Sequence, residues 1–243
     1  MIFPLTSQVF FSRVNVVCML LALGAWTGMA PGVFADDSDC LLCHGDKDFS
    51  MTKPDGTVVP LYVDEEAYKK SIHADEGCTA CHADATPDHD PGLAKVDCST
   101  CHDESKAFAK SPHGHLAQTG SPEFRGCIEC HGKHDIVAAA APESPVSKLN
   151  QPKTCGKCHS NPEMAKKYFI PVAHPAQDYE KSAHAQAIAK GNLNAAVCSD
   201  CHGAHEVLPL DDPASKIAKK NIQNTCGACH KQPLEEYVQS IHG

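Results

Sequence analysis

Every cysteine between residues 36 and 243 belongs to a Cys-x-x-Cys-His pentad, and this pentad occurs seven times. Two thiols at this spacing can form thioethers with the two vinyl groups of one haem, and the adjacent histidine then binds the iron as its proximal ligand. The predicted attachment residues are Cys40, Cys43, Cys78, Cys81, Cys98, Cys101, Cys127, Cys130, Cys155, Cys158, Cys198, Cys201, Cys226 and Cys229. The predicted proximal ligands are His44, His82, His102, His131, His159, His202 and His230.

Disulfides and zinc sites also use pairs of cysteines, but neither explains the pentads as fully as haem does. Fourteen cysteines in an exported chain would ordinarily indicate a framework of seven disulfides, but disulfides do not require a histidine after every second cysteine. Zinc sites with four ligands would need the pentads to combine two by two, and seven pentads cannot all combine in this way. We therefore predict seven covalently bound haem c groups, each containing iron.

The histidines outside the pentads are the candidates for the second axial ligand of each iron. Nine histidines lie outside the pentads, whereas the chain after residue 35 has only Met51 and Met164 as alternative thioether ligands. We therefore expect bis-histidine haems, which have lower potentials than His/Met haems. The predicted distal ligands are His73, His89, His113, His134, His184, His205 and His242. His174 is the main alternative to His89, and His115 is a further one.

Two recurring elements supply six of these distal ligands. An aromatic-x-x-Ser-x-His element, at the end of a short stretch with helical composition, contains His73, His113, His184 and His242. A Cys-His-Gly-x-His element contains His134 and His205, each three residues after a proximal histidine. That separation is too short to reach the opposite face of the same haem. We therefore expect these two residues to bind a neighbouring iron.

The chain also repeats itself with a period of 71 residues. His113 corresponds to His184, Cys127 to Cys198 and Asn150 to Asn221, without a gap between them. A repeat that carries both haem motifs and free histidines indicates a duplicated dihaem module. The predicted organisation is a signal peptide at 1–35, a three-haem segment at 36–110, a dihaem module at 111–181 and its duplicate at 182–243.

The first 35 residues have the apolar run and the small residues before Asp36 that are typical of a secretory signal peptide. A retained membrane anchor is the alternative. We expect a periplasmic protein, with an extracellular location as the second choice. The chain has 6% aromatic residues, and its one tryptophan, Trp26, lies in the predicted signal peptide. A conventional core of side chains is therefore not expected.

The predicted fold is mainly irregular, with short α-helices and one small β-hairpin, and it is organised around packed haems. The hairpin is expected within residues 49–63, because Pro54-Asp-Gly-Thr57 lies between two short alternating segments. Helices are expected notably at 177–190 and 234–240. Without haem the chain should not fold, as with other small domains that need a metal.

The combined order of these motifs resembles the bacterial multihaem cytochromes of the cytochrome c3 family and the Ser-x-His-Gly type respiratory multihaem proteins. The resemblance rests on Cys40-Leu-Leu-Cys-His-Gly-Asp-Lys-Asp with its hairpin, and on the repeated Ser-x-His, Cys-His-Gly-x-His and Asn-x-x-x-Thr-Cys-Gly-x-Cys-His order. It implies an electron carrier or electron-transfer subunit in anaerobic respiration. Such proteins are often paired with a membrane cytochrome b that oxidises quinol.

An electron conduit without catalytic residues is the leading functional hypothesis, because seven distal histidines would leave no iron with an open position. The net charge of −9 favours docking to basic redox proteins as donor and acceptor, and no nucleic-acid partner is expected. A reductase of nitrite, hydroxylamine or a sulfur oxyanion is one alternative, although Arg125 is the only arginine after residue 35. A second alternative is self-assembly into an extracellular filament, in which His242 binds a haem of another subunit.

Overall fold

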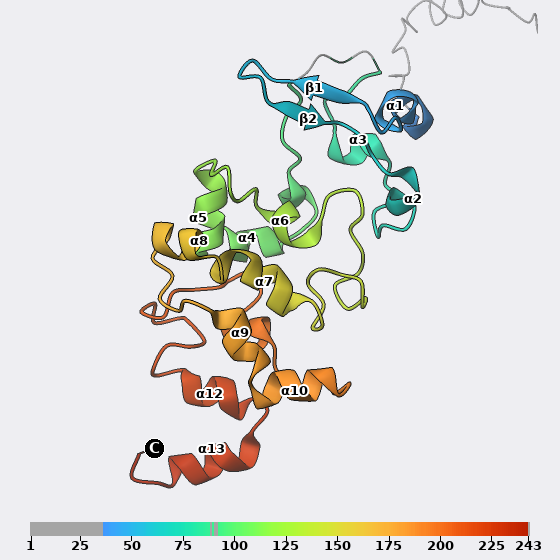
Figure 1. The fold of residues 1–243 in the computed structure, drawn as a ribbon. Helices are drawn as coiled ribbons and strands as arrows, with labels where there is room; N and C mark the ends of the chain where they lie inside the picture. The colour runs from blue at the N-terminus through green and yellow to red at the C-terminus, as the bar shows by residue number, and fades with distance from the viewer. Residues whose placement is uncertain (1–35, 88, 90–91, 243) are drawn as a thin grey trace, which may run out of the picture. The chain divides into compact units, whose positions relative to one another are not determined.

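Figure 1 shows the computed structural model, which describes residues 36–87, 89 and 92–242. The predicted signal peptide lies outside the described residues. The described residues form one unit in the pattern of internal contacts. The searched part of the chain contains no helix that is both long enough and apolar enough to span a membrane.

The chain folds into many short elements joined by irregular segments, as the sequence predicts. The N-terminal elements are α1 (Asp37–His44), β1 (Ser50–Thr52), β2 (Val58–Pro60), α2 (Glu65–Tyr68), α3 (Cys78–Cys81), the 3-10 helix η1 (Cys98–Thr100) and α4 (Glu104–Phe108). The following elements are α5 (Pro112–Gln118), α6 (Cys127–His131), α7 (Gln151–His159), α8 (Pro162–Lys167) and α9 (Pro175–Glu180). The last are α10 (Ala183–Ala189), α11 (Cys198–His202), α12 (Ile222–Gly227) and α13 (Lys231–Val238).

The predicted β-hairpin is confirmed. Strands β1 and β2 pair in antiparallel fashion, with Met51 opposite Val59. Gly56 has a φ of 85°, a left-handed conformation that glycine adopts without strain. The side chain of Asp55 accepts a hydrogen bond from the Thr57 amide at 2.9 Å, which closes the turn. The Pro54-Asp-Gly-Thr57 sequence therefore forms the turn for which its residue types are suited.

The single helix predicted at 177–190 is wrong, because the structure divides it into α9 and α10. Ser182 lies between them with an extended backbone, at φ −74° and ψ 158°. Its hydroxyl accepts a hydrogen bond from the Ala185 amide at 3.1 Å and so caps α10. The serine of the aromatic-x-x-Ser-x-His element thus starts a new helix. The final helix also begins earlier than predicted, at Lys231 instead of Leu234.

The 71-residue repeat is visible in matching hydrogen bonds. The Asn150 side-chain amide donates to the carbonyls of Pro142 and Ser144 at 2.8 and 2.9 Å. Its counterpart Asn221 donates to the carbonyls of Pro213 and Ser215 at 2.9 and 2.8 Å. Each asparagine folds the loop that precedes a pentad helix, α7 in one copy and α12 in the other. The two copies therefore present their pentads by the same local structure.

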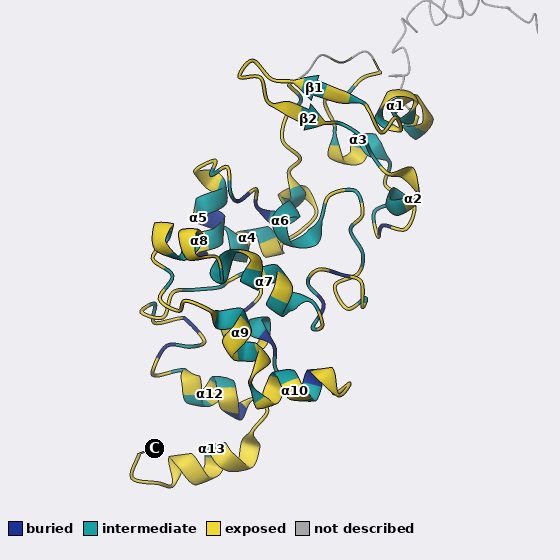
Figure 2. Cartoon of the chain, in the orientation of Figure 1, coloured by how far each residue is buried: buried dark blue, intermediate teal, exposed yellow. Residues whose placement is uncertain are grey.

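Very few side chains are buried in the described part of the chain, as Figure 2 shows. The buried hydrophobic residues there are Phe124, Ile188, Val197 and Ala218, and five serines are buried as well. Large apolar side chains such as Leu42, at 81% exposure, face outward. A domain of this length normally buries a much larger hydrophobic core. The polypeptide therefore lacks the apolar interior that would hold these helices together.

One ionic contact ties α8 to the loop before α6 and should make the fold sensitive to acid. Lys167 pairs with Glu123, whose carboxylate also accepts hydrogen bonds from Ser121 and Tyr168, and these contacts lower the pKa of Glu123 to about 2. A carboxyl with a lowered folded-state pKa stabilises the fold above its ordinary pKa of 4.5, and this contribution is lost as the pH falls towards 2.

We therefore expect Glu123→Gln to lower the thermal midpoint at about pH 6 and to have little effect near pH 2, as measured by differential scanning calorimetry. Equal midpoints for the two proteins at the higher pH would contradict the role assigned to this contact.

Candidate haem sites

Short helices present the pentads. α6 and α11 each begin at the first pentad cysteine and end at its histidine, whereas α1 and α7 end at a pentad histidine. One helical turn brings the two thiols of a pentad to the same side, which is the arrangement that thioether attachment needs. The fourteen predicted attachment cysteines are all free thiols in this structure.

Consecutive pentads lie next to one another in chain order. The first cysteines of neighbouring pentads meet in three places: Cys40 with Cys78, Cys98 with Cys127, and Cys155 with Cys198. At the other three junctions the second cysteine of the earlier pentad lies near enough to the first cysteine of the next for an electrostatic interaction: Cys81 with Cys98, Cys130 with Cys155, and Cys201 with Cys226. The seven pentads thus form a series along the chain.

Side-chain contacts hold neighbouring pentads together. Asp37, before the first pentad, accepts a hydrogen bond from the Cys78 amide at 2.7 Å. Glu129, inside the fourth pentad, pairs with Lys157, inside the fifth, at 2.8 Å. Gln151 in α7 accepts a hydrogen bond from the Ser199 amide in α11 at 3.1 Å. These bonds fix the spacing of the pentads in their series.

Six of the seven proximal histidines face a second histidine. The ring centroids of these pairs are 5.8–6.3 Å apart. The pairs, with the proximal residue first, are His44–His89, His82–His134, His102–His73, His131–His205, His159–His113 and His230–His184. Two of them cross the predicted segment boundaries, since His82 faces His134 and His131 faces His205.

This spacing fits one metal ion between two imidazole rings. A bond from a metal to a histidine nitrogen is about 2 Å long, and the nitrogen is about 1 Å from its ring centre, so two opposed ligands have centroids about 6 Å apart. The His131–His205 pair has this separation, at 6.1 Å, with an angle of 16° between the rings. The centroid distances of the six pairs are therefore those expected for two imidazole rings that share one metal ion.

The protonation of the rings also suits metal binding. Burial lowers the pKa of five half-buried members of these pairs, which are His82, His113, His131, His134 and His159. A lowered pKa keeps the imidazole neutral near pH 7, and the neutral form is the one that binds a metal. In addition, Nδ1 of His82 is buried without a hydrogen-bond partner among the described residues. A buried ring nitrogen without a hydrogen-bond partner costs folding free energy. Coordination of a metal would use a nitrogen of the His82 ring.

A main-chain hydrogen bond orients His44, the first predicted proximal ligand. His44 Nδ1 lies 2.7 Å from the carbonyl oxygen of Leu61, so this nitrogen is the donor. The bond leaves Nε2 free to bind iron and fixes the plane of the ring, as outer hydrogen bonds do for other metal-bound histidines. Leu61 follows strand β2, and the hairpin therefore helps to position the first site.

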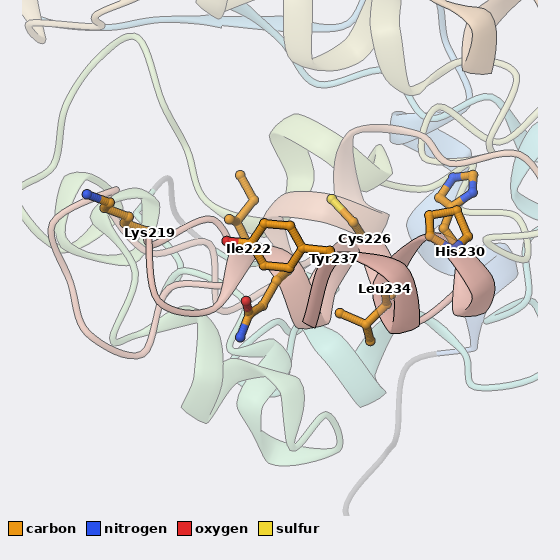
Figure 3. Close-up of a pocket in the computed structure, with 9 residues that line it drawn as sticks. Lys219, Ile222, Cys226, His230, Leu234 and Tyr237 are labelled. Atoms are coloured by element: carbon orange, nitrogen blue, oxygen red, sulfur yellow. The ribbon is translucent and has the colours of Figure 1, made fainter. Parts of the chain in front are cut away.

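A cavity of about 340 Å³ lies beside the last pentad, between α12 and α13 (Figure 3). Its walls are mainly apolar and include Ile222, Leu234 and Tyr237. Cys226 and His230 also line the cavity. A concave apolar surface with both a thiol and an imidazole at its wall has the chemistry needed to bind a haem face and its iron. The residues present at this site therefore fit a covalent haem.

Two of the predicted iron ligands face no second histidine in the described part of the chain. His202 is the one proximal histidine that faces no histidine ring within the described residues, and His242 is the one predicted distal ligand without such a pair. Both residues are exposed. His115 and His174 are exposed as well and take part in none of the six pairs. The role of His242 as a ligand stays a prediction.

Sequence reasoning missed Phe124, which packs against the predicted distal ligand His113. Its ring stacks on that of His113 at a centroid distance of 5.5 Å and on Phe108 at 6.4 Å. Phe124 is only 8% exposed. Its counterpart in the 71-residue repeat is Ala195, so the repeat gave no signal for it. Phe124 fixes the position of α5 and of His113 within it.

Replacement of Phe124 by alanine should destabilise the haem-loaded protein by about 3–5 kcal/mol, because it leaves a cavity against two aromatic rings. Phe169, which is 89% exposed, provides a matched control, and Phe169→Ala should change stability by no more than about 0.5 kcal/mol. Chemical denaturation followed by circular dichroism measures both effects. Equal losses in the two variants would show that Phe124 has no special packing role.

Comparison with known proteins supports the chemistry of these sites. Residues 72–160 match the family model described as cytochrome c3. This stretch contains four of the seven pentads, together with His73, His89, His113 and His134. Neither the curated proteins nor the solved structures gave a match. Over residues 72–160 the chain is therefore similar to the cytochrome c3 family, and this similarity is consistent with a multihaem c-type cytochrome.

Proposed function

We propose that this protein passes single electrons along seven covalently attached, low-potential c-type haems. The observation that carries the proposal is the set of six histidine pairs with ring centroids 5.8–6.3 Å apart. Bound haem supplies the one-electron iron couple. The two histidines of each pair would hold the iron from both sides, and such an iron would have no open position for a small molecule. This arrangement favours electron transfer over substrate chemistry.

The series of pentads supports a path in chain order. The cysteines of each pentad lie near those of the next pentad in the chain, from Cys40 to Cys226. Haems attached at neighbouring cysteines would lie within a short distance of one another.

The proposed partners are redox proteins on either side of the path. A membrane cytochrome b that oxidises quinol is the proposed donor, and a periplasmic or extracellular protein is the proposed acceptor in anaerobic respiration. The net charge of −9 favours partners with a basic surface, since opposite charges accelerate association. Haem attachment outside the cytoplasm agrees with a periplasmic location.

A reductase with one open haem is a second candidate, because His202 is exposed and faces no second histidine among the described residues. A five-coordinate iron at this pentad could bind nitrite or a related anion. The rest of the chain offers little for such a substrate, since Arg125 is the only arginine after residue 35. Electron transfer therefore remains the better supported function.

Optical and electron paramagnetic resonance spectra of the purified, haem-loaded protein separate the two candidates. The conduit predicts low-spin signals from all the haems in the oxidised protein, complete reduction by dithionite, and no turnover of nitrite, hydroxylamine or sulfite by the reduced protein. Turnover of one of these substrates, together with a high-spin signal that the substrate alters, would establish the reductase instead. An active multihaem nitrite reductase, assayed in parallel, is the positive control.

A further inference from the structure

The six facing histidine pairs differ in the angle between their ring planes. The rings of His113 and His159 are nearly perpendicular, with an angle of 78° between them. The rings of His131 and His205 are nearly parallel, with an angle of 16°. The centroid distances of these two pairs are almost the same, at 5.8 and 6.1 Å. The sites therefore differ in the orientation of their predicted ligands, and not in the spacing.

The 71-residue repeat shows that the recurring element alone does not set this angle. His113 and His184 are equivalent in the repeat, and each belongs to a copy of the aromatic-x-x-Ser-x-His element. The angle is nevertheless 78° between His113 and His159 but 46° between His184 and His230. A feature that differs between the two copies of the repeat must account for this difference.

A stack of aromatic side chains occurs in the first copy of the repeat. The ring of Phe124 stacks on that of His113 at an angle of 29° and on that of Phe108 at 30°. The counterpart of Phe124 is Ala195, which has no ring. The counterpart of Phe108 is Tyr179, whose hydroxyl donates to a main-chain carbonyl at 3.0 Å. The second copy therefore cannot form the same stack.

The loop that carries Phe124 is also held in place by an insertion in the first copy. The stretch from the pentad histidine to the next Ser-x-His histidine is 25 residues long here (159 to 184) and 12 in the second copy (230 to 242). The extra length contains α8 and Tyr168, whose hydroxyl donates to the carboxylate of Glu123 at 3.1 Å. Lys167 at the end of α8 pairs with the same carboxylate. The insertion thus fixes the residue next to Phe124.

We propose that Phe124 is a positioning residue that holds the His113 ring crossed to that of His159, and that this orientation raises the reduction potential of the haem at the fifth pentad. The proposal rests on the proposed function, because it assumes an iron between these two histidines. Packing contacts around a metal-bound histidine orient its ring, and the axial ligands tune the potential of a haem.

The direction of the effect follows from the electrons of the iron. An imidazole ring raises the energy of the iron d orbital that lies at right angles to the ring plane. Two parallel rings raise the same orbital, and this stabilises oxidised low-spin iron because its one electron vacancy lies in that orbital. Reduced low-spin iron has no such vacancy and gains nothing. Crossed rings act equally on two orbitals, so the oxidised form loses this advantage and the potential rises.

Electron paramagnetic resonance of the oxidised, haem-loaded protein distinguishes the two orientations, since crossed rings give a highly anisotropic low-spin signal and parallel rings a rhombic one. The wild type should show two highly anisotropic signals, one from the fifth pentad and one from the third, where the rings of His102 and His73 are at 86°. Phe124→Leu, which removes the ring but keeps an apolar side chain, should convert one of these signals to a rhombic one. A redox titration should show a lower potential for one haem in this variant. Phe124→Tyr keeps the ring and should match the wild type.

Two results for Phe124→Leu would overturn the proposal. One is an unchanged pair of highly anisotropic signals, and the other is a high-spin haem at the fifth pentad, because Phe124 would then retain His113 instead of orienting it. If Phe124→Leu does not take up haem, Tyr168→Phe decides: it loosens the loop without altering Phe124 and should shift the same signal in the same direction, and an unchanged spectrum would contradict the proposal. Either failure with low-spin haems in the wild type leaves the proposed function intact, whereas a wild type without low-spin haem would overturn both.

Discussion

Production of this chain without haem attachment should yield a polypeptide with no cooperative unfolding transition. The described part of the chain buries only four hydrophobic side chains, which are Phe124, Ile188, Val197 and Ala218. Burial of apolar surface is the main force that offsets the loss of chain entropy on folding, and four side chains supply a small part of what a chain of this length needs. The haem faces must supply the remainder. The free energy of haem binding is then also the free energy of folding.

Far-ultraviolet circular dichroism and hydrogen exchange measure this effect directly. The unloaded chain should show a sloping thermal profile and fast exchange of nearly all its amides, including those of α7 and α10. The haem-loaded chain, prepared from the same gene in a host with the attachment machinery, is the control and should unfold in a defined transition. A cooperative transition in the unloaded chain would contradict the account of its interior.

Replacement of His205 by alanine should change the haem at Cys127 and Cys130 from low-spin to high-spin. The ring centroids of His205 and His131 are 6.1 Å apart. The counterpart of His205 in the 71-residue repeat is His134, whose ring centroid is 6.3 Å from that of His82. Removal of one member leaves the iron with a single histidine and an open position. We expect one haem in seven to bind carbon monoxide in the reduced variant, with the other six unchanged.

His115→Ala is the matched control for this variant. His115 is exposed and takes part in none of the six pairs, so its loss should leave every haem low-spin. Carbon monoxide difference spectra, calibrated by total haem, give the fraction of open sites in each variant. No binding in the His205 variant, or equal binding in the two variants, would show that His205 does not complete the iron site.

The site residues are predicted from sequence alone, because covalent haem attachment imposes a strict spacing on cysteine and histidine. The 71-residue register identifies Asn150 and Asn221 as equivalent, and the structure gives them matching hydrogen bonds. The hairpin is predicted correctly because Gly56 and Asp55 suit a tight turn. These features all depend on local sequence, where spacing and residue type are sufficient.

The pairing of the histidines could not be predicted in the same way. His82 and His134 are 52 residues apart, and His131 and His205 are 74 apart, so their approach depends on the packing of separate helices. The support of His113 by Phe124 has no counterpart in the repeat and left no pattern. The break at Ser182 was missed because helical composition extends across it, whereas the serine side chain competes for the backbone and starts α10.

The central claim is that this chain carries seven covalent haems, one at every pentad. Intact-mass spectrometry of the exported protein, followed by peptide mapping, tests it most directly. The account predicts a mass increase of seven haems, with one haem on each pentad peptide from Cys40–His44 to Cys226–His230. A mature protein with fewer than seven haems, or with disulfides between pentad cysteines, would contradict it.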